Sequence, residues 1–180
     1  MSTTQEQIGV KLLQEQIQFA HTVLEDTTKD VTTEIATNKP SGLPRSIGSY
    51  YAHILIVEDL TINGLLKKQA PLFASDWRDR TGFDGLSPDN PAEWPAWSSQ
   101  AGSDVISSRA YAQAVYATTA SYLENLSDPD LANIVDLSAV GFGQQTTSWL
   151  LSVFVLTNCN WHTGEISCLK GGHGLKGYPF

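Results

Sequence analysis

The feature that most constrains this chain is a stripe of apolar residues at helical spacing near its beginning. Members of the stripe follow one another mostly at intervals of three or four residues, the repeat that places side chains on one face of an α-helix. The stripe consists of Val10, Leu13, Ile17, Ala20, Leu24, Val31 and Ile35. It predicts one amphipathic helix over residues 5–37, ended by the turn-forming residues 38–42.

A second apolar segment follows Pro44 and is predicted to form a helix over residues 46–70, with Ser46 in the N-cap position. Its run at 54–57, Ile-Leu-Ile-Val, is equally compatible with a buried strand. An α/β fold built on this run and on the run at 153–156 is the structural alternative. We favour a helix because no proline interrupts residues 45–70, and because a helix that is apolar on all sides suits the centre of a bundle.

Two more helices are predicted in the second half of the chain, over residues 103–125 and 146–170. The last one ends at a pair of glycines, Gly171 and Gly172. Its inward-facing stripe consists of Leu151, Val155, Asn158, His162, Ile166 and Leu169. Four helices in 180 residues predict an all-α fold, a four-helix bundle that forms a single domain over residues 1–180.

Two connections complete the predicted bundle. Residues 71–100 are rich in proline and glycine and contain Trp77, Trp94 and Trp97, a combination that indicates a packed loop and not a flexible linker. The tryptophans either cover one end of the bundle or line a pocket or an interface. Residues 131–143 are expected to form a short helical turn and an irregular link, with the Gly-Phe-Gly sequence at 141–143 as a hinge.

The charge and the cysteines restrict partners and location. A net charge of −8 repels nucleic-acid phosphates and anionic lipid, so neither nucleic acid nor membrane is an expected partner. Cys159 and Cys168 on one helix are too far apart for a disulfide. The first residues show no signal-peptide pattern, and the longest apolar runs are too short to span a bilayer. Together these features predict a cytoplasmic protein.

Two polar residues interrupt the apolar stripe of the last helix. Asn158 and His162 are four residues apart and therefore lie on the same helix face. His53, on the second helix, can add a third ligand and complete the three-ligand, open-position arrangement of catalytic zinc and nickel sites. The sequence thus suggests a metal site at His53, Asn158 and His162. In the alternative, Asn158 and His162 bond to each other or to water within the core.

Three further side chains near these positions have alternative interpretations. Cys159 either approaches the predicted site or packs in the core, as buried cysteines usually do. Glu165, about one turn after His162, is either an acid or base that supports the site or a solvated helix residue. His21 flanks the first apolar stripe and is expected to be structural.

Two stretches of the chain resemble a known family. Residues 44–53, Pro-Arg-Ser-Ile-Gly-Ser-Tyr-Tyr-Ala-His, are similar to the opening of the second helix in the DinB/YfiT-like superfamily. Residues 158–166, Asn-Cys-Asn-Trp-His-Thr-Gly-Glu-Ile, are similar to the His-x-x-x-His-x-Gly-Glu/Gln-Ile signature of its last helix. The tail at 169–179 also resembles the ending of some members. The likeness covers most of the chain in element order.

This resemblance implies an up-down-down-up four-helix bundle with one long crossover, usually a homodimer. Many members hold a divalent metal, often nickel or zinc, through one histidine of the second helix and two of the last. Those ligand positions fall on His53, Asn158 and His162. Asn158 departs from the family pattern, which has a histidine at this position. An amide oxygen is a weaker donor to these metals than imidazole, so the change is expected to weaken metal binding.

The resemblance also implies a range of functions. Some relatives are metal-dependent isomerases and transferases that use a low-molecular-weight thiol, such as mycothiol or bacillithiol. We therefore expect a transferase or hydrolase that uses a divalent metal and a thiol cofactor to act on a small molecule. The alternative is a non-catalytic bundle that binds ligands or partners and whose metal site is degenerate. The three loop tryptophans, which a monomer has difficulty covering, favour a homodimer.

Overall fold

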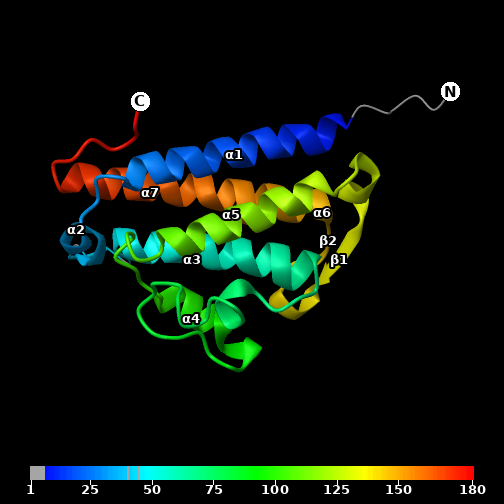
Figure 1. The fold of residues 1–180 in the computed structure, drawn as a ribbon, viewed down its shortest axis with the longest axis horizontal. Helices are drawn as coiled ribbons and strands as arrows, with labels where there is room; N and C mark the ends of the chain where they lie inside the picture. Colours follow the sequence, from blue (N-terminus) through cyan, green and yellow to red (C-terminus); the bar gives the residue numbers. More distant parts are fainter. Residues whose placement is uncertain (1–6, 40, 44) are drawn as a thin grey trace.

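The computed structural model describes residues 7–39, 41–43 and 45–180. This part of the chain is mostly helical, and its long helices lie side by side (Figure 1). They are α1 (Ile8–Thr28), α3 (Ile47–Asp59), α5 (Arg109–Glu124) and α7 (Asn158–Gly172). Helices α1 and α7 run in one direction, and α3 and α5 run in the opposite direction (Figure 1). The prediction of a mainly helical protein is confirmed.

The first helix is shorter than predicted, and residues 5 and 6 of the predicted span lie outside the described residues. After α1, a turn leads into the short helix α2 (Thr33–Thr37). The Thr32 hydroxyl accepts a hydrogen bond from the backbone N–H of Ile35 at 3.4 Å and so starts a new helix. The apolar stripe does not reveal this break, because Val31 in the turn is buried like Leu24 before it and Ala36 after it.

The second helix begins where the sequence predicts. Ser46 accepts a hydrogen bond from the backbone N–H of Ser49 at 3.2 Å, which satisfies an amide that has no partner within the helix. The run at residues 54–57 is helical, so the alternative of a buried strand is wrong. The chain continues as a π-helix over Leu60–Leu66.

This helix ends before residue 70 because the buried carboxylate of Asp59 binds the backbone of the segment that follows it. Asp59 accepts hydrogen bonds from the backbone N–H groups of Leu72 and Phe73 at 3.0 and 2.9 Å. Lys68 adopts a left-handed conformation, with a φ of 55°, where the chain reverses. Because Leu72 lies 13 positions after Asp59, the sequence near the end of the helix contains no local signal that would predict where it ends.

The long connection packs against the bundle and contains a helix that was not predicted, α4 (Trp94–Gln100). Trp94 and Trp97 both contact Phe73, with ring centroids 5.1 and 5.2 Å apart, and Trp77 contacts Tyr111 at 5.9 Å. All three tryptophans are partly buried against the core. The interpretation that they cover part of the bundle is confirmed, and their partial burial within one chain weakens the expectation that a monomer has difficulty covering them.

The third helix begins at Arg109, six residues later than predicted. The preceding segment cannot be helical, because Val105 has a φ of 66°. The Ser103 hydroxyl holds this turn by accepting a hydrogen bond from the backbone N–H of Val105 at 2.9 Å.

A small β-hairpin corrects the all-α prediction for the link before the last helix. Strands β1 (Ile134–Leu137) and β2 (Gly143–Thr146) pair antiparallel, with Ile134 opposite Thr146 and Leu137 opposite Gly143. The predicted glycine hinge forms the turn between them, where Gly141 has a φ of 86°, a conformation that glycine adopts without steric cost.

The last helical stretch is continuous in the chain but changes its winding. A short helix α6 (Thr147–Leu150) leads into a π-helix over Leu151–Thr157, which leads into α7. A π-turn changes the rotation per residue and so alters which side chains share a face. The change occurs directly before Asn158, the first polar residue of the predicted stripe.

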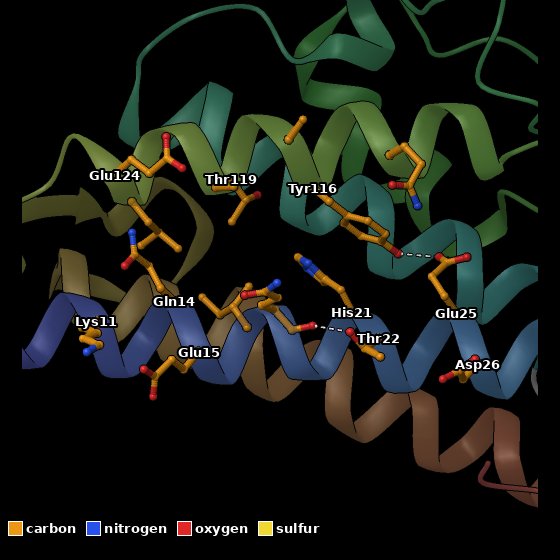
Figure 2. A pocket seen from close by; sticks show the side chains of 16 residues that line it. Lys11, Gln14, Glu15, His21, Thr22, Glu25, Asp26, Tyr116, Thr119 and Glu124 are labelled. Atoms are coloured by element: carbon orange, nitrogen blue, oxygen red, sulfur yellow. Dashed lines mark hydrogen bonds between the residues drawn. The ribbon is translucent and has the colours of Figure 1, made fainter.

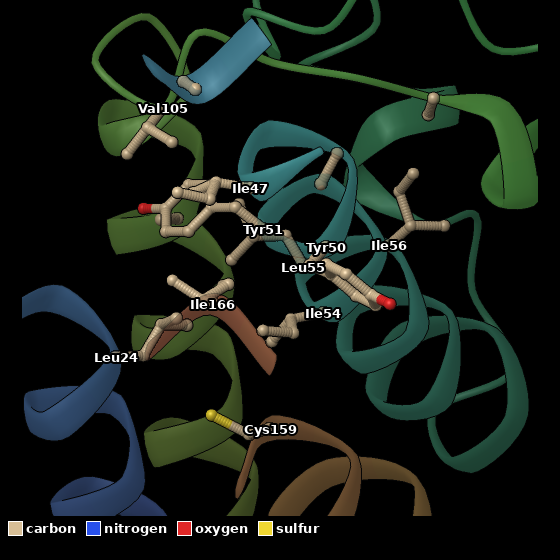
Figure 3. Close-up of a cluster of buried hydrophobic side chains, with 14 of the residues drawn as sticks. Leu24, Ile47, Tyr50, Tyr51, Ile54, Leu55, Ile56, Val105, Cys159 and Ile166 are labelled. Carbon is tan, nitrogen blue, oxygen red and sulfur yellow. The ribbon is translucent and has the colours of Figure 1, made fainter. Parts of the chain in front are cut away.

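The main core lies between α1, α3, α5 and α7 (Figure 3). Tyr51, Ile54, Leu55 and Ile166 are almost completely buried there. The Tyr50 hydroxyl, by contrast, points away from Leu24 and the middle of this cluster (Figure 3). Within the described part of the chain, no helix is long and apolar enough to cross a membrane.

Candidate functional site

His53 on α3 and His162 on α7 face each other. Their ring centroids are 4.9 Å apart, and the ring planes are nearly perpendicular, at 82°. The two helices pack directly against each other, which explains why residues more than a hundred positions apart meet. The structure thus brings together two of the three predicted site residues.

Each imidazole is held at its Nδ1 atom by an oxygen. His53 Nδ1 lies 3.2 Å from the hydroxyl of Ser98 on α4, and His162 Nδ1 bonds to the carboxylate of Glu165. An ionised carboxylate only accepts hydrogen bonds, so the proton of a neutral His162 sits on Nδ1 and the Nε2 lone pair is available. Among the described residues, neither Nε2 atom has a hydrogen-bond partner.

Burial keeps His53 neutral. Removal from water, together with the nearby charges of Arg45 and His162, lowers its pKa to about 4. A neutral imidazole at physiological pH can donate a lone pair to a metal or accept a proton from a ligand. The electrostatics of this position therefore suit a ligand or a base.

A tyrosine and an arginine extend the site. The Tyr50 ring lies 5.2 Å from the ring of His162, and the Arg45 guanidinium carbon lies 5.7 Å from the Tyr50 ring centroid. Burial raises the pKa of the Tyr50 hydroxyl, and the neighbouring Glu165 carboxylate raises it further. Tyr50 therefore remains a neutral hydroxyl at physiological pH.

Asn158 lies about one helical turn before His162, as predicted. Its Nδ2 atom is buried and has no hydrogen-bond partner among the described residues. The alternative in which Asn158 and His162 form a hydrogen-bonded pair is therefore not what the structure contains. The convergence of Asn158 with both histidines on a single ion remains a prediction.

Cys159 and Glu165, the two other candidates near the site, have different environments. Cys159 is 1% exposed and belongs to the core; its sulfur lies 4.0 Å from the Thr163 hydroxyl, and burial raises the pKa of the thiol. The interpretation of Cys159 as a packing residue is confirmed. Glu165 is not a merely solvated residue, because it orients His162 as carboxylates orient histidines in metal sites.

Ser98, Arg45 and Tyr50 were not predicted as site residues. Ser98 reaches His53 from α4, a helix that the sequence did not predict. Arg45 directly precedes the N-cap residue Ser46, and Tyr50 lies in the first turns of α3. Their positions at the start of this helix were the only sequence signal that could have indicated a role in the site. Neither spacing nor composition distinguishes them from ordinary helix-start residues.

A second polar cluster lies between α1 and α5, where a groove of about 850 Å³ opens (Figure 2). His21 Nε2 lies 2.9 Å from the Glu58 carboxylate, whose other oxygen accepts a hydrogen bond from Thr119 at 2.6 Å. The His21 ring stacks on Tyr116, with centroids 3.9 Å apart. The Tyr116 hydroxyl donates to Glu25 at 2.8 Å (Figure 2). The prediction that His21 is structural is consistent with these buried contacts.

Fold and site together define a helical protein in which two histidines meet between α3 and α7. A model of the DinB superfamily matches residues 16–166, most of the chain. The chain therefore belongs to the DinB superfamily, and the resemblance inferred from its motifs is confirmed.

Two solved structures are similar in fold. The first is described as the conserved protein of a locus from Enterococcus faecalis; it is 23% identical, the match covers 89% of this chain and 94% of that one, and the TM-score is 0.72. The second is a DinB-like protein from Bacillus cereus ATCC 10987; it is 17% identical, with 93% and 94% covered and a TM-score of 0.53. At these identities the likeness concerns the fold alone. No curated protein matches the chain.

Proposed function

We propose that the His53–His162 cluster is a divalent-metal site at which a small molecule is bound and transformed. The reaction class that we infer is a transfer or hydrolysis with a low-molecular-weight thiol as co-substrate, as the family resemblance implies. Membership of the DinB superfamily supports this proposal.

One observation carries the proposal: the two imidazole rings lie 4.9 Å apart, each is anchored at Nδ1, and among the described residues neither Nε2 atom has a hydrogen-bond partner. Histidine ligands in metal sites commonly donate their other ring N–H to an oxygen, which fixes the tautomer and the orientation of the ring. Glu165 does this for His162, and Ser98 is in position to do it for His53.

The side chains of the site suit a divalent ion such as zinc or nickel, and they are expected to bind it weakly. Within the described part of the chain, no three His, Cys, Asp or Glu side chains converge closely enough to hold a metal, so two imidazoles are the strong donors. The Asn158 amide oxygen is the available third donor, and it is weaker than imidazole toward zinc or nickel. Water is expected to complete the coordination.

Each side chain of the proposed metal site has a distinct role. When bound, the metal supplies Lewis-acid activation of a thiol or a water molecule. His53 and His162 hold it, Glu165 keeps the proton of His162 on Nδ1, and Tyr50 forms a wall of the site. The long connection and α4 cover His53 and limit the access of water.

A second candidate function is a non-catalytic module that binds a small ligand without metal. The presence of Asn158 in place of a third histidine favours this candidate, and so does the positive charge of Arg45, which lowers the pKa of His53 and disfavours a dication. In both candidates the same cluster is the binding site.

Metal analysis tests the proposal. Zinc or nickel bound to the purified protein should be lost in the double variant His53→Ala, His162→Ala, while far-UV circular dichroism stays helical, because a domain of this size does not need a metal to fold. His173→Ala, in the tail, is the matched control and should retain the metal. A double variant that unfolds, or one that keeps its metal, would contradict the proposal.

We also propose an up-down-down-up bundle that assembles into a homodimer in the cytoplasm. The directions of the long helices in Figure 1 support the bundle topology, and the two unbridged cysteines support a reducing compartment. For the homodimer, the family resemblance is the main support, because the tryptophans are already partly buried within one chain. Light scattering that gives the mass of a single chain at micromolar concentration would contradict it.

A further inference from the structure

The groove between α1 and α5 lies apart from the histidine cluster, and neither His53 nor His162 lines it. It has a volume of about 850 Å³. Glu124 of α5 stands at one end of the groove, and Glu25 of α1 stands at the other end, beside Tyr116 (Figure 2). The groove is therefore a separate place where a small molecule can be held, with a carboxylate at each end.

The side chains that line the groove carry more negative than positive charge. Among the described residues that line it, Lys11 has the only ammonium group, whereas carboxylates come from Glu15, Glu25, Asp26 and Glu124. Within the described part of the chain, Asp26 is the only one of these carboxylates in a salt bridge, with Lys29 at 3.4 Å. Carboxylates without a positive partner attract a cation from solution.

The Glu25 carboxylate is held in a fixed orientation. Its Oε1 atom accepts hydrogen bonds from the hydroxyls of Tyr51 and Tyr116, both at 2.8 Å. Its Oε2 atom has no hydrogen-bond partner among the described residues. A carboxylate that the protein has already oriented loses little freedom when it binds a charged donor through its second oxygen.

His21 supplies a hydrogen-bond acceptor beside Tyr116. The residue is only 9% exposed, and its ring projects from α1 into the space between the two helices (Figure 2). The ionised Glu58 carboxylate only accepts hydrogen bonds, so Nε2 of His21 carries a proton. In the neutral ring Nδ1 is then an acceptor, and it has no partner among the described residues. Since buried polar groups are nearly always hydrogen-bonded, this nitrogen points to a donor from outside the chain.

The middle of the groove is apolar. Ala117, Ala120 and Leu123 line it from α5, and Ile17 lines it from α1. On α5 these residues lie between Tyr116, which bonds to Glu25, and Glu124. The eight residues from 116 to 124 extend about 12 Å along the helix axis. A ligand that reaches both carboxylates therefore needs an apolar middle, which is stabilised by contact with these side chains.

We propose that the groove between α1 and α5 binds a linear aliphatic polyamine. One terminal ammonium group donates hydrogen bonds to Oε2 of Glu25 and Nδ1 of His21. The methylene groups lie along the apolar middle, and an ammonium group farther along the chain contacts Glu124. The site does not depend on the proposed metal site, and the bond between His21 and Glu58 keeps its role in the fold.

Polyamines of different length test the span of the site. Spermine carries four amino groups on a long chain, whereas putrescine carries two and is too short to reach from Glu25 to Glu124. In isothermal titrations of the full chain at physiological ionic strength, spermine should bind at least about tenfold more tightly than putrescine. Undetectable binding of spermine, or equal binding of the two amines, overturns the proposal.

Matched variants separate a specific site from general attraction to an acidic protein. Glu25→Gln should lower spermine affinity at least about tenfold, the effect of one charged hydrogen bond. The new amide keeps an oxygen that can accept from Tyr51 and Tyr116, so the fold should be retained. The same substitution at an exposed residue of α2, Glu34→Gln, should leave the affinity nearly unchanged. Equal losses in the two variants would mean diffuse attraction and would overturn the proposal.

The far end of the groove provides a second variant, which does not disturb buried contacts. Glu124 is exposed, and Glu124→Gln should weaken spermine several-fold while leaving putrescine unchanged, because only the longer amine reaches it. NMR titration of the wild type with spermine should shift the signals of His21 and Tyr116 and leave those of His53 and His162 in place. Shifts at His53 and His162 without shifts at His21 would contradict the assignment of the groove.

Discussion

Two histidine–carboxylate pairs lie in the described part of the chain, and they use opposite edges of the imidazole ring. In the first, His21 contacts Glu58 through Nε2, and the two side chains are 11% and 1% exposed. In the second, His162 contacts Glu165 through Nδ1, and the side chains are 20% and 48% exposed. Composition does not distinguish the pairs, but their geometry does.

The difference shows which pair serves the fold and which one can serve a ligand. The outer edge of the His21 ring is occupied by Glu58, and its face is covered by Tyr116. Glu58 in turn is occupied by Thr119. His162 is held at Nδ1 by Glu165, its ring lies 4.9 Å from the ring of His53, and its Nε2 atom has no partner among the described residues. A histidine whose Nε2 atom has no partner keeps that nitrogen available to a ligand, whereas one whose Nε2 atom bonds to a buried carboxylate contributes stability.

The largest effect that we expect concerns the buried pair of His21 and Glu58. His21→Ala leaves the Glu58 carboxylate buried with Thr119 as its remaining partner, so the free energy of unfolding should fall by about 3 kcal/mol. His162→Ala should cost less than about 1 kcal/mol, because Glu165 is half-exposed and water replaces its partner. Urea unfolding of both variants measures the difference, and the reverse order would break the comparison.

A smaller effect concerns the pH dependence of stability in the metal-free protein. The pKa of His53 is about 4 in the folded state and 6.5 in the unfolded chain. Between these values the unfolded state binds more protons, so the free energy of unfolding decreases as the pH falls from 6.5 to 4. His53 should account for a loss of about 2 kcal/mol between pH 7.5 and 4.5.

Urea unfolding at the two pH values, with a chelator present, measures this contribution. His53→Gln should reduce the loss on acidification by that amount, whereas the tail variant His173→Gln should not change it. If His53→Gln loses as much stability on acidification as the wild type, His53 is not held neutral by burial.

The sequence predicts those parts of the molecule that depend on local periodicity. The stripe from Val10 to Leu24 predicts α1, Ser46 predicts the start of α3, and the glycine pair after residue 170 predicts the end of α7. The meeting of His53 and His162 was also predicted, because the motifs that carry these residues resemble those of one family. Each of these signals lies within a few residues of the feature that it predicts.

The features that the sequence did not predict depend on contacts between distant residues. The end of the second helix is set by Asp59 through Leu72 and Phe73, and the partner of His53 comes from α4, 45 residues away. The unsatisfied state of Arg45 Nη1 is a property of the packed structure. No pattern of spacing contains this information, since it arises only when the elements are packed.

The central claim is that residues 53, 158 and 162 converge on one ion, and Asn158→His tests it most directly. Imidazole is a stronger donor than an amide to zinc and nickel, so affinity should rise at least about tenfold, roughly 1.4 kcal/mol. Adding His53→Ala to this variant should lower it again, because both ligands serve the same metal. Isothermal titration of Zn²⁺ into the wild type, the single variant and the double variant measures all three values. Equal or undetectable affinity in the wild type and Asn158→His would contradict the convergence of the three residues and leave the metal-free module as the function of the bundle.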